Sequence, residues 1–389
     1  MPVTVRPAER IERLPPYLFA EIDRLKKEVA ARGVDLISLG IGDPDMPTFP
    51  HVVRALADAA GRPENHRYPD YEGLPSFRAA AADFVRRRFS VRVDPATEVV
   101  SLIGSKEGIA NLAVAIVDPG DVVLVPDPGY PVYSIGTSFN GGTPYPMPLT
   151  AEHGFLPDLH AIPEEIARRA KLMWLGYPNN PTAAVASTAF FAEVVEFASR
   201  HGIIVAHDNA YSEIYYDEPP PSFLATPGAE TLGIEFHSLS KTYNMTGWRV
   251  GFAIGNRALI AALGKVKTNV DSGVFQAVQE AGIAALSGDQ APVAEMRALY
   301  RERRDLLLGA LAELGLEAQP VRGTFYVWVH VPRGFTSASL TAKMLQEIGV
   351  VITPGSGFGA AGEGYVRFSL TVATARLREA VERLRTLSL

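Results

Sequence analysis

Apolar positions through the middle of the chain follow two alternating patterns. Short runs rich in Val, Ile and Leu end in turn residues, and each is followed by a segment with apolar positions at helical spacing. Strands alternating with helices predict an α/β fold with a mostly parallel, helix-covered sheet, whose ligands bind at the carboxyl ends of the strands. The expected strands lie within 99–104, 121–130, 171–181, 202–208, 234–241 and 248–255, and the expected helices cover 51–61, 75–89, 105–116 and 187–201.

The pattern changes after about residue 285, which predicts a second, smaller α+β unit. It begins with a long charged helix over 291–315 and ends with a helix after 370; between them we expect strands within 324–331, 350–355 and 365–370 and a helix over 338–349. The N-terminal helix (17–33) and strand (35–42) have no sheet of their own, so we expect them to join this unit. The predicted domains are 46–284, and 1–45 together with 285–389.

Composition narrows the class of protein. The 389 residues carry 37 basic and 43 acidic side chains, so no basic field is present to hold nucleic acid or an anionic membrane. There is no cysteine, no apolar run of the ~18 to 20 residues that a membrane span needs and no segment of signal-peptide type. The starting expectation is a cytoplasmic enzyme.

Other charged groups have ordinary interpretations. The eight histidines, His201, His207 and His237 among them, show no metal-ligand spacing, so no metal site is expected. The run from Arg301 to Arg304 is expected to form a solvated helix face.

The segment SLSKTYNMTGWRVG (238–251) is the most informative for chemistry. Lys241 directly follows an apolar strand, where poor solvation lowers the pKa of an amine and lets it attack a carbonyl to form an imine. Ser238, Ser240 and Arg249 supply donors suited to a phosphate. Taken alone, this segment favours a solvated surface lysine over a catalytic one.

Three further strand ends carry polar groups. Asp208, in DNAY, could hold a protonated ring nitrogen, or it could cap a helix or form a core salt bridge. Asn180, in YPNNPT, is compatible with an ordinary turn. The turn GSKEG, with Ser105 and Lys106, could offer N–H groups to a phosphate, although a lone glycine-rich turn is weak evidence.

Together these motifs resemble one family, the class I and II aminotransferases, which are pyridoxal-phosphate enzymes of fold type I. The likeness covers nearly the whole chain in order, from LGIGDPD through GSKEG, PDPGY, NNPT, DNAY and SLSK to YVRFSL. The details LPPYLFAEID, LGIGDPDMPTFP and YPNNPTAAVA are similar to the LL-diaminopimelate aminotransferase group.

The resemblance implies a role for each residue. Lys241 would hold pyridoxal phosphate as an imine and, once freed, move the substrate Cα proton; Asp208 would keep the ring nitrogen protonated; and Arg367 would bind the substrate α-carboxylate. The other implied cofactor contacts are Asn180 and Tyr211 at the 3-oxygen, Tyr130 on the ring face, and Ser105, Lys106, Ser238, Ser240 and Arg249 at the phosphate. Tyr17, Gly42, Lys106, Tyr130 and Asn180 would also line the substrate pocket.

Sites in this family are completed across a homodimer. Tyr68 would donate a hydroxyl to the phosphate in the neighbouring subunit, and Asn269 would reach across to its substrate. Tyr68 could instead pack against its own loop, and Asn269 could cap a helix that begins near Gly273.

The implied reaction moves an amino group between an amino acid and a 2-oxo acid, with ping-pong kinetics. LL-diaminopimelate with 2-oxoglutarate and glutamate is the substrate set that the resemblance favours. Alanine, aspartate or aromatic amino acids remain alternatives, as does a carbon–sulfur β-lyase reaction. A non-catalytic sensor of a transcription regulator would need a DNA-binding domain, and only about 14 residues precede LPPY.

Overall fold

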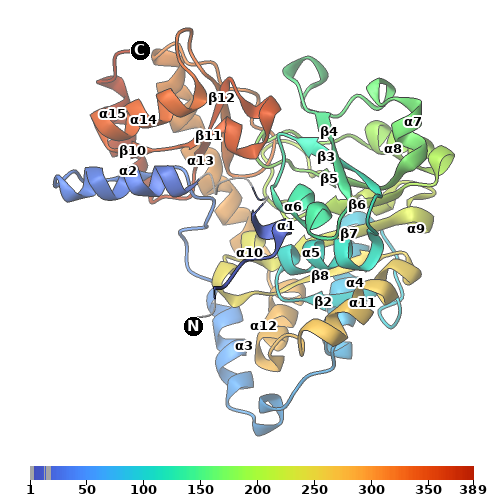
Figure 1. Cartoon of the computed structure of the whole chain (residues 1–389). Helices are drawn as coiled ribbons and strands as arrows, with labels where there is room; N and C mark the ends of the chain where they lie inside the picture. Colours follow the sequence, from blue (N-terminus) through green and yellow to red (C-terminus); the bar gives the residue numbers. More distant parts are fainter. Residues whose placement is uncertain (1–3, 13, 15–18) are drawn as a thin grey trace.

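A seven-stranded sheet forms the centre of the computed structural model, which describes residues 4–12, 14 and 19–389 (Figure 1). The strand order is β2-β8-β7-β6-β5-β3-β4. Five neighbouring strands, from β7 to β4, are parallel, whereas β8 is antiparallel to both β2 and β7. The bounds are β2 Val99–Leu102, β3 Val122–Asp127, β4 Thr143–Pro148, β5 Ala170–Gly176, β6 Ile204–Asp208, β7 Gly233–Ser238 and β8 Gly251–Gly255. The predicted α/β class, with a mostly parallel sheet, is confirmed.

Helices cover both faces of this sheet. Successive strand residues point to opposite faces, so Met173 and Leu175 join one hydrophobic core while Leu172 and Trp174 join the other. The first core is closed by α3 (Pro50–Ala60), α4 (Pro75–Phe89), α8 (Thr188–His201) and α12 (Gln276–Ser287), and the second by α5 (Ser105–Ile116), α6 (Val132–Phe139) and α11 (Arg257–Val270). Burial on both faces explains the continuous apolar runs in the central strands.

The C-terminal elements gather on one side of the sheet, in orange and red in Figure 1. They comprise α13 (Ala291–Glu313), α14 (Ser337–Ile348), α15 (Thr374–Arg385) and an antiparallel sheet of β11 (Thr353–Pro354), β12 (Tyr365–Ser369) and β9 (Tyr326–His330). From the N-terminal segment, β1 (Ile37–Ser38) pairs in parallel with β10 (Val350–Val351), and α2 (Phe19–Ala31) packs against α14. The N-terminal helix and strand thus contact elements of the C-terminal segment. The short helices are α1 (Glu9–Glu12), α7 (Glu164–Arg169), α9 (Ala229–Leu232) and α10 (Leu239–Thr242).

Two local differences from the expectations have clear physical reasons. Strand β4 was not predicted because TPYPMP contains three prolines; it lies at the sheet edge, where missing N–H donors are tolerated. Strand β8 begins only at Gly251, because the chain first makes a 3₁₀ turn over Thr246–Trp248 and then takes φ 55° at Arg249.

Candidate active site

The carboxyl ends of β5, β6 and β7 lie side by side and bring the predicted polar groups together. Asn180 follows β5, Asp208 ends β6 and Lys241 lies in α10, directly after β7. Parallel strands place their carboxyl ends at one edge of the sheet, so residues up to 61 positions apart meet there. At the turn after β5, Asn179 accepts hydrogen bonds from the Thr182 amide and hydroxyl. Asn180 itself lies in this turn, as the turn interpretation has it, and its Oδ1 also accepts a hydrogen bond from Arg367.

Lys241 is a largely buried amine that faces the segment after β1. Its Nζ donates to the Gly42 carbonyl at 2.9 Å and lies 5.7 Å from the centre of the Phe325 ring. Burial lowers the pKa of Lys241 from 10.5 to about 8, although the nearby Asp43 carboxylate acts in the opposite direction. An amine with this pKa is partly neutral, and hence nucleophilic, near neutral pH.

The two carboxylate oxygens of Asp208 differ in their partners. Oδ2 accepts a hydrogen bond from the Tyr133 hydroxyl at 2.9 Å, whereas Oδ1 is buried and has no partner. Burial raises the pKa of this carboxyl group, and the Tyr133 bond acts against that rise. The Ala210 backbone amide also acts to lower this pKa, but no helix begins directly after Asp208 and no core salt bridge holds it in the described part of the chain.

A corner rich in donors forms where α5 begins. Ser105 and Lys106 open α5, and Gly104 before them has φ 75°, a left-handed conformation that suits glycine. A side chain at Gly104 would overlap the Arg249 guanidinium, so the glycine allows Arg249 to lie against this turn. Across the corner, the Ser238 hydroxyl accepts from the Ser240 amide at 3.2 Å. The helix N-terminus, the hydroxyls and the guanidinium together favour an anion.

Arg367, on β12, is the second buried cation of the site. Its Nη1 donates to Asn180 Oδ1 at 2.7 Å and its Nη2 to the Gly40 carbonyl at 2.7 Å, while its Nε is buried without a partner. The guanidinium lies against two rings, 4.1 Å from the centre of Tyr326 and 4.6 Å from that of Phe358. Burial lowers the pKa of Arg367. A carboxylate is the ligand that suits such a guanidinium.

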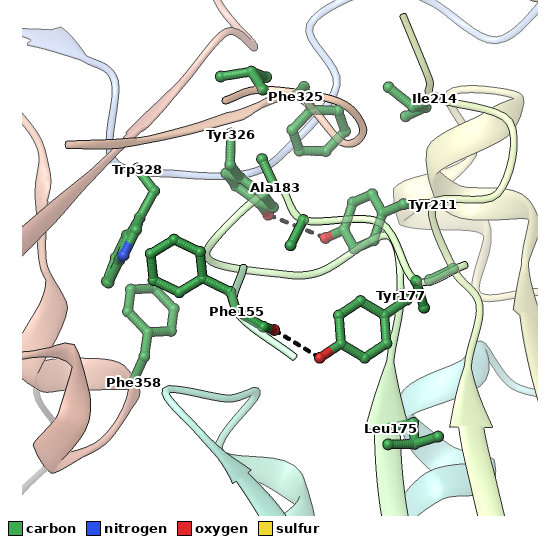
Figure 2. Packing of buried hydrophobic residues seen from close by; sticks show 14 of the residues in the cluster. Phe155, Leu175, Tyr177, Ala183, Tyr211, Ile214, Phe325, Tyr326, Trp328 and Phe358 are labelled. Carbon is green, nitrogen blue, oxygen red and sulfur yellow. Dashed lines mark hydrogen bonds between the residues drawn. The ribbon is translucent and has the colours of Figure 1, made fainter. Parts of the chain in front are cut away.

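Figure 2 shows the buried aromatic residues packed near these groups, among them Tyr211, Phe325 and Tyr326. The Tyr211 and Tyr326 hydroxyls are 3.1 Å apart, and the Tyr326 ring fills the space where a side chain at Gly42 would lie. The Lys106 Nζ is 5.6 Å from the centre of the Tyr130 ring.

The sequence reading missed both Tyr326 and Tyr133. Tyr133 lies nearly one helical turn after Tyr130 in PGYPVY, and this spacing was the available signal for it. Tyr326 was hidden within an apolar strand, and no pattern in the sequence distinguishes it.

One expectation about the arginine-rich helix is wrong. Arg303 is 2% exposed, and its guanidinium holds both carboxylate oxygens of Asp45, at 2.7 and 2.9 Å. It also donates to the Leu370 carbonyl, at 3.0 Å. The helix turns this one arginine of the run inward, where it anchors the segment whose Gly40 and Gly42 carbonyls contact Arg367 and Lys241. A surface pattern cannot reveal a partner 258 residues away.

Two predicted residues, Tyr68 and Asn269, lie outside this cluster. Tyr68 is 86% exposed, and Asn269 is exposed near the end of α11, where its side chain donates to the Lys265 carbonyl. The alternative that Asn269 caps the next helix is wrong, because α12 begins at Gln276 with Phe275 at its N-cap. Tyr17 lies outside the described residues.

Within residues 4–12, 14 and 19–389, no helix combines the length and apolar character needed to cross a membrane.

Comparison with known proteins agrees with this geometry. Residues 34–384 match the family model for aminotransferase class I and II. The chain is 59% identical to the LL-diaminopimelate aminotransferase of Moorella thermoacetica, over 97% of both chains, and 56% identical to that of Aquifex aeolicus, over 98% of this chain and 99% of the other. Among solved structures, apo-BacF from Bacillus subtilis superposes with TM-score 0.95 at 41% identity, covering 100% of this chain and 99% of that one. An aspartate aminotransferase mutant from Thermus thermophilus gives 0.92 at 31%, covering 99% and 100%. The chain belongs to the class I and II aminotransferases and is an enzyme of the transaminase type.

Proposed function

We propose that this aminotransferase uses pyridoxal phosphate to transfer an amino group from LL-diaminopimelate to 2-oxoglutarate. The observation that carries the substrate proposal is the identity of 52–59%, over nearly the full chain, to relatives named LL-diaminopimelate aminotransferase. An aspartate or aromatic substrate is the second candidate, because solved structures with those names superpose well; their identity of 31% makes it the weaker one.

The residues present fit the cofactor. The unpartnered buried Oδ1 of Asp208 is an acceptor suited to a protonated ring nitrogen. The amine of Lys241 suits an aldehyde, and Ser105, Ser238, Ser240 and Arg249 form a corner suited to a phosphate. Lys106 would add a further phosphate donor, Tyr130 would cover the ring face, and Asn180 and Tyr211 would bond the 3-oxygen.

These positions suggest roles in the reaction for the remaining site residues. When bound, pyridoxal phosphate would supply an electron sink for the breaking of the substrate Cα–H bond. The Lys241 Nζ, once it no longer holds the cofactor, moves the Cα proton, and its lowered pKa keeps part of the amine neutral. Arg367 orients the substrate by its α-carboxylate, with Asn180 beside it, while the Gly42 carbonyl lies beside Lys241. Tyr17 is assigned to the same pocket from the sequence alone.

We also propose that the active enzyme is a homodimer. The exposed Tyr68 and Asn269 are free to reach a neighbouring subunit, where they would contact the phosphate and the substrate. The apolar side chains of Val270 and Phe275, 67% and 45% exposed, lie close to Asn269 in the chain and are suited to burial in such an interface. Sedimentation at assay concentration tests this: an active monomer contradicts it.

The proposed domain division remains 46–284, and 1–45 with 285–389. It is supported by the pairing of β1 with β10 and by the packing of α2 on α14. Lys241 and Asp208 then come from the large domain, and Arg367 and Gly42 from the small one.

The test of the cofactor assignment is chemical. Protein loaded with pyridoxal phosphate should absorb in the visible range and lose that band on borohydride reduction, with the added mass on Lys241. A label on another lysine refutes the assignment. Substrate choice is read from a panel of LL-diaminopimelate, alanine, aspartate and phenylalanine. Oxo-acid formation that persists without 2-oxoglutarate, with release of thiol or ammonia, would indicate a lyase instead.

A further inference from the structure

A buried carboxylate lies behind the candidate site. Glu235, in the middle of β7, is fully buried and pairs in register with His207 of β6. Paired residues share a face of the sheet and adjacent residues alternate, so Glu235, His207 and His237 lie on the face opposite that of Asp208. From the sequence, these two histidines carried only the expectation that they bind no metal.

Protein donors surround the Glu235 carboxylate. Oε1 faces His237 Nε2 at 2.7 Å and accepts from Asn209 Nδ2 at 3.1 Å. Oε2 faces His207 Nδ1 at 2.9 Å and accepts from the Phe223 amide at 3.0 Å. The Ser222 hydroxyl is within 3.0 Å of both oxygens.

These contacts favour an ionised carboxylate. Burial acts to raise the pKa of Glu235, but the bonds from His207 and His237 outweigh it, and the pKa is well below its ordinary value. Within the described residues no group of three or more His, Asp or Glu side chains could hold a metal ion.

The partners of Glu235 are the chain neighbours of the proposed cofactor contacts. His207 and Asn209 flank Asp208 on both sides, and His237 directly precedes Ser238. His207 also reaches the turn that carries Asn180. Its Nε2 donates to the Tyr177 carbonyl at 3.0 Å, because a carbonyl can only accept. One carboxylate thus connects the ends of β5, β6 and β7.

We propose that Glu235 is a positioning residue of the cofactor site, which holds these three strand ends at a fixed spacing through His207, Asn209 and His237. The inference rests on the proposed function, since the strand ends matter because they carry Asn180, Asp208 and Ser238. Groups that contact a reacting molecule need positions fixed to about 0.5 Å, and an outer layer of hydrogen bonds supplies that precision. A glutamine at this position keeps the shape but turns an amide N–H₂ toward donors.

The test compares Glu235→Gln with Glu363→Gln in the enzyme loaded with pyridoxal phosphate. Glu363 is the control: its more exposed carboxylate also accepts a backbone amide and a hydroxyl, both from Ser337, but lies in the C-terminal unit, away from the strand ends. Glu235→Gln should change the visible circular dichroism of the bound cofactor and raise its dissociation constant roughly tenfold, the scale carried by outer-shell partners. Glu363→Gln should change neither. Wild-type values of both quantities in Glu235→Gln would overturn the proposal.

A second variant and a cofactor-independent measurement complete the test. Asn209→Ala removes a single donor and should move both quantities in the same direction by less; an Asn209→Ala protein identical to wild type overturns the proposal if Glu235→Gln does not fold. In cofactor-free protein, either variant should speed amide hydrogen exchange around 177–182 and 208–211. If the variants exchange faster but wild-type protein treated with pyridoxal phosphate shows no visible band, the proposed function is rejected and the anchoring role stands. If exchange in the variants is unchanged, the anchoring role is refuted.

Discussion

The lowered pKa of Lys241 leads to a quantitative prediction about its reactivity. Burial is the main cause of the fall from 10.5 to about 8, and the positive charges of Arg249 and Arg367 add to it. At pH 7 about one amine in ten is then neutral, against roughly one in 3,000 for an unshifted lysine, a difference of about 300-fold. The cofactor-free protein should therefore carry one unusually nucleophilic lysine.

Competitive acetylation measures this directly. Cofactor-free protein is labelled with trace acetic anhydride between pH 6 and 10, and mass spectrometry follows each lysine, with the exposed Lys265 as reference. The labelling rate of Lys241 should reach half its plateau near pH 8. Asp43 acts to raise this pKa, so Asp43→Asn should move the midpoint lower.

Two results would refute the reasoning. A Lys241 midpoint at or above pH 10 would mean that burial does not control the amine, and a midpoint that rises in Asp43→Asn would reverse the assigned charge effect. The sign for stability follows from the same values. Between about pH 8 and 10.5 the unfolded chain holds the proton and the folded protein does not, so the free energy of unfolding gains up to about 3 kcal/mol from this group as pH rises through that window.

The remaining predictions concern residues around the site. Tyr133→Phe leaves Asp208 Oδ2 without its donor, which should raise the carboxyl pKa further and weaken pyridoxal phosphate binding about tenfold, measured by absorbance titration; unchanged affinity contradicts this role. Arg303→Met leaves the Asp45 carboxylate without its ion-pair partner and should lower the free energy of unfolding by about 3 to 5 kcal/mol in urea titrations, an effect that would be absent if water replaced the guanidinium. Gly104→Ala places a methyl group against the Arg249 guanidinium at the phosphate corner and strains a residue in the left-handed conformation. Pyridoxal phosphate should therefore bind more weakly to this variant, by more than any loss of folding stability accounts for. An equal loss of affinity for unphosphorylated pyridoxal would argue against a phosphate effect.

Much of the fold could be predicted because it depends on local patterns. Helix α5 over Ser105–Ile116 and helix α4 over Pro75–Phe89 have the predicted bounds, since each begins at a clear strand or proline signal and keeps helical spacing throughout. Strand β4 was missed because its prolines are tolerated only at a sheet edge, and edge position is a property of the assembled sheet.

The candidate site, like the fold, could be predicted from the sequence only in part. Polar residues at or just after the end of a strand, such as Asp208 and Lys241, stand out in the sequence because a polar group after a buried run has few structural explanations. Tyr133 and Tyr326 became visible only through their distances to Asp208 and Tyr211.

The sequence by itself determined the alternation of strands and helices, the order of the motifs and the family, because each is encoded by neighbouring residues. Only the tertiary structure decided that Arg303 turns inward to Asp45, that the Gly42 carbonyl meets Lys241 and that Glu235 joins three strand ends. The contacts between different strands and helices join residues from 26 to 258 positions apart, and such partners are selected by packing and charge in three dimensions, which no local pattern records.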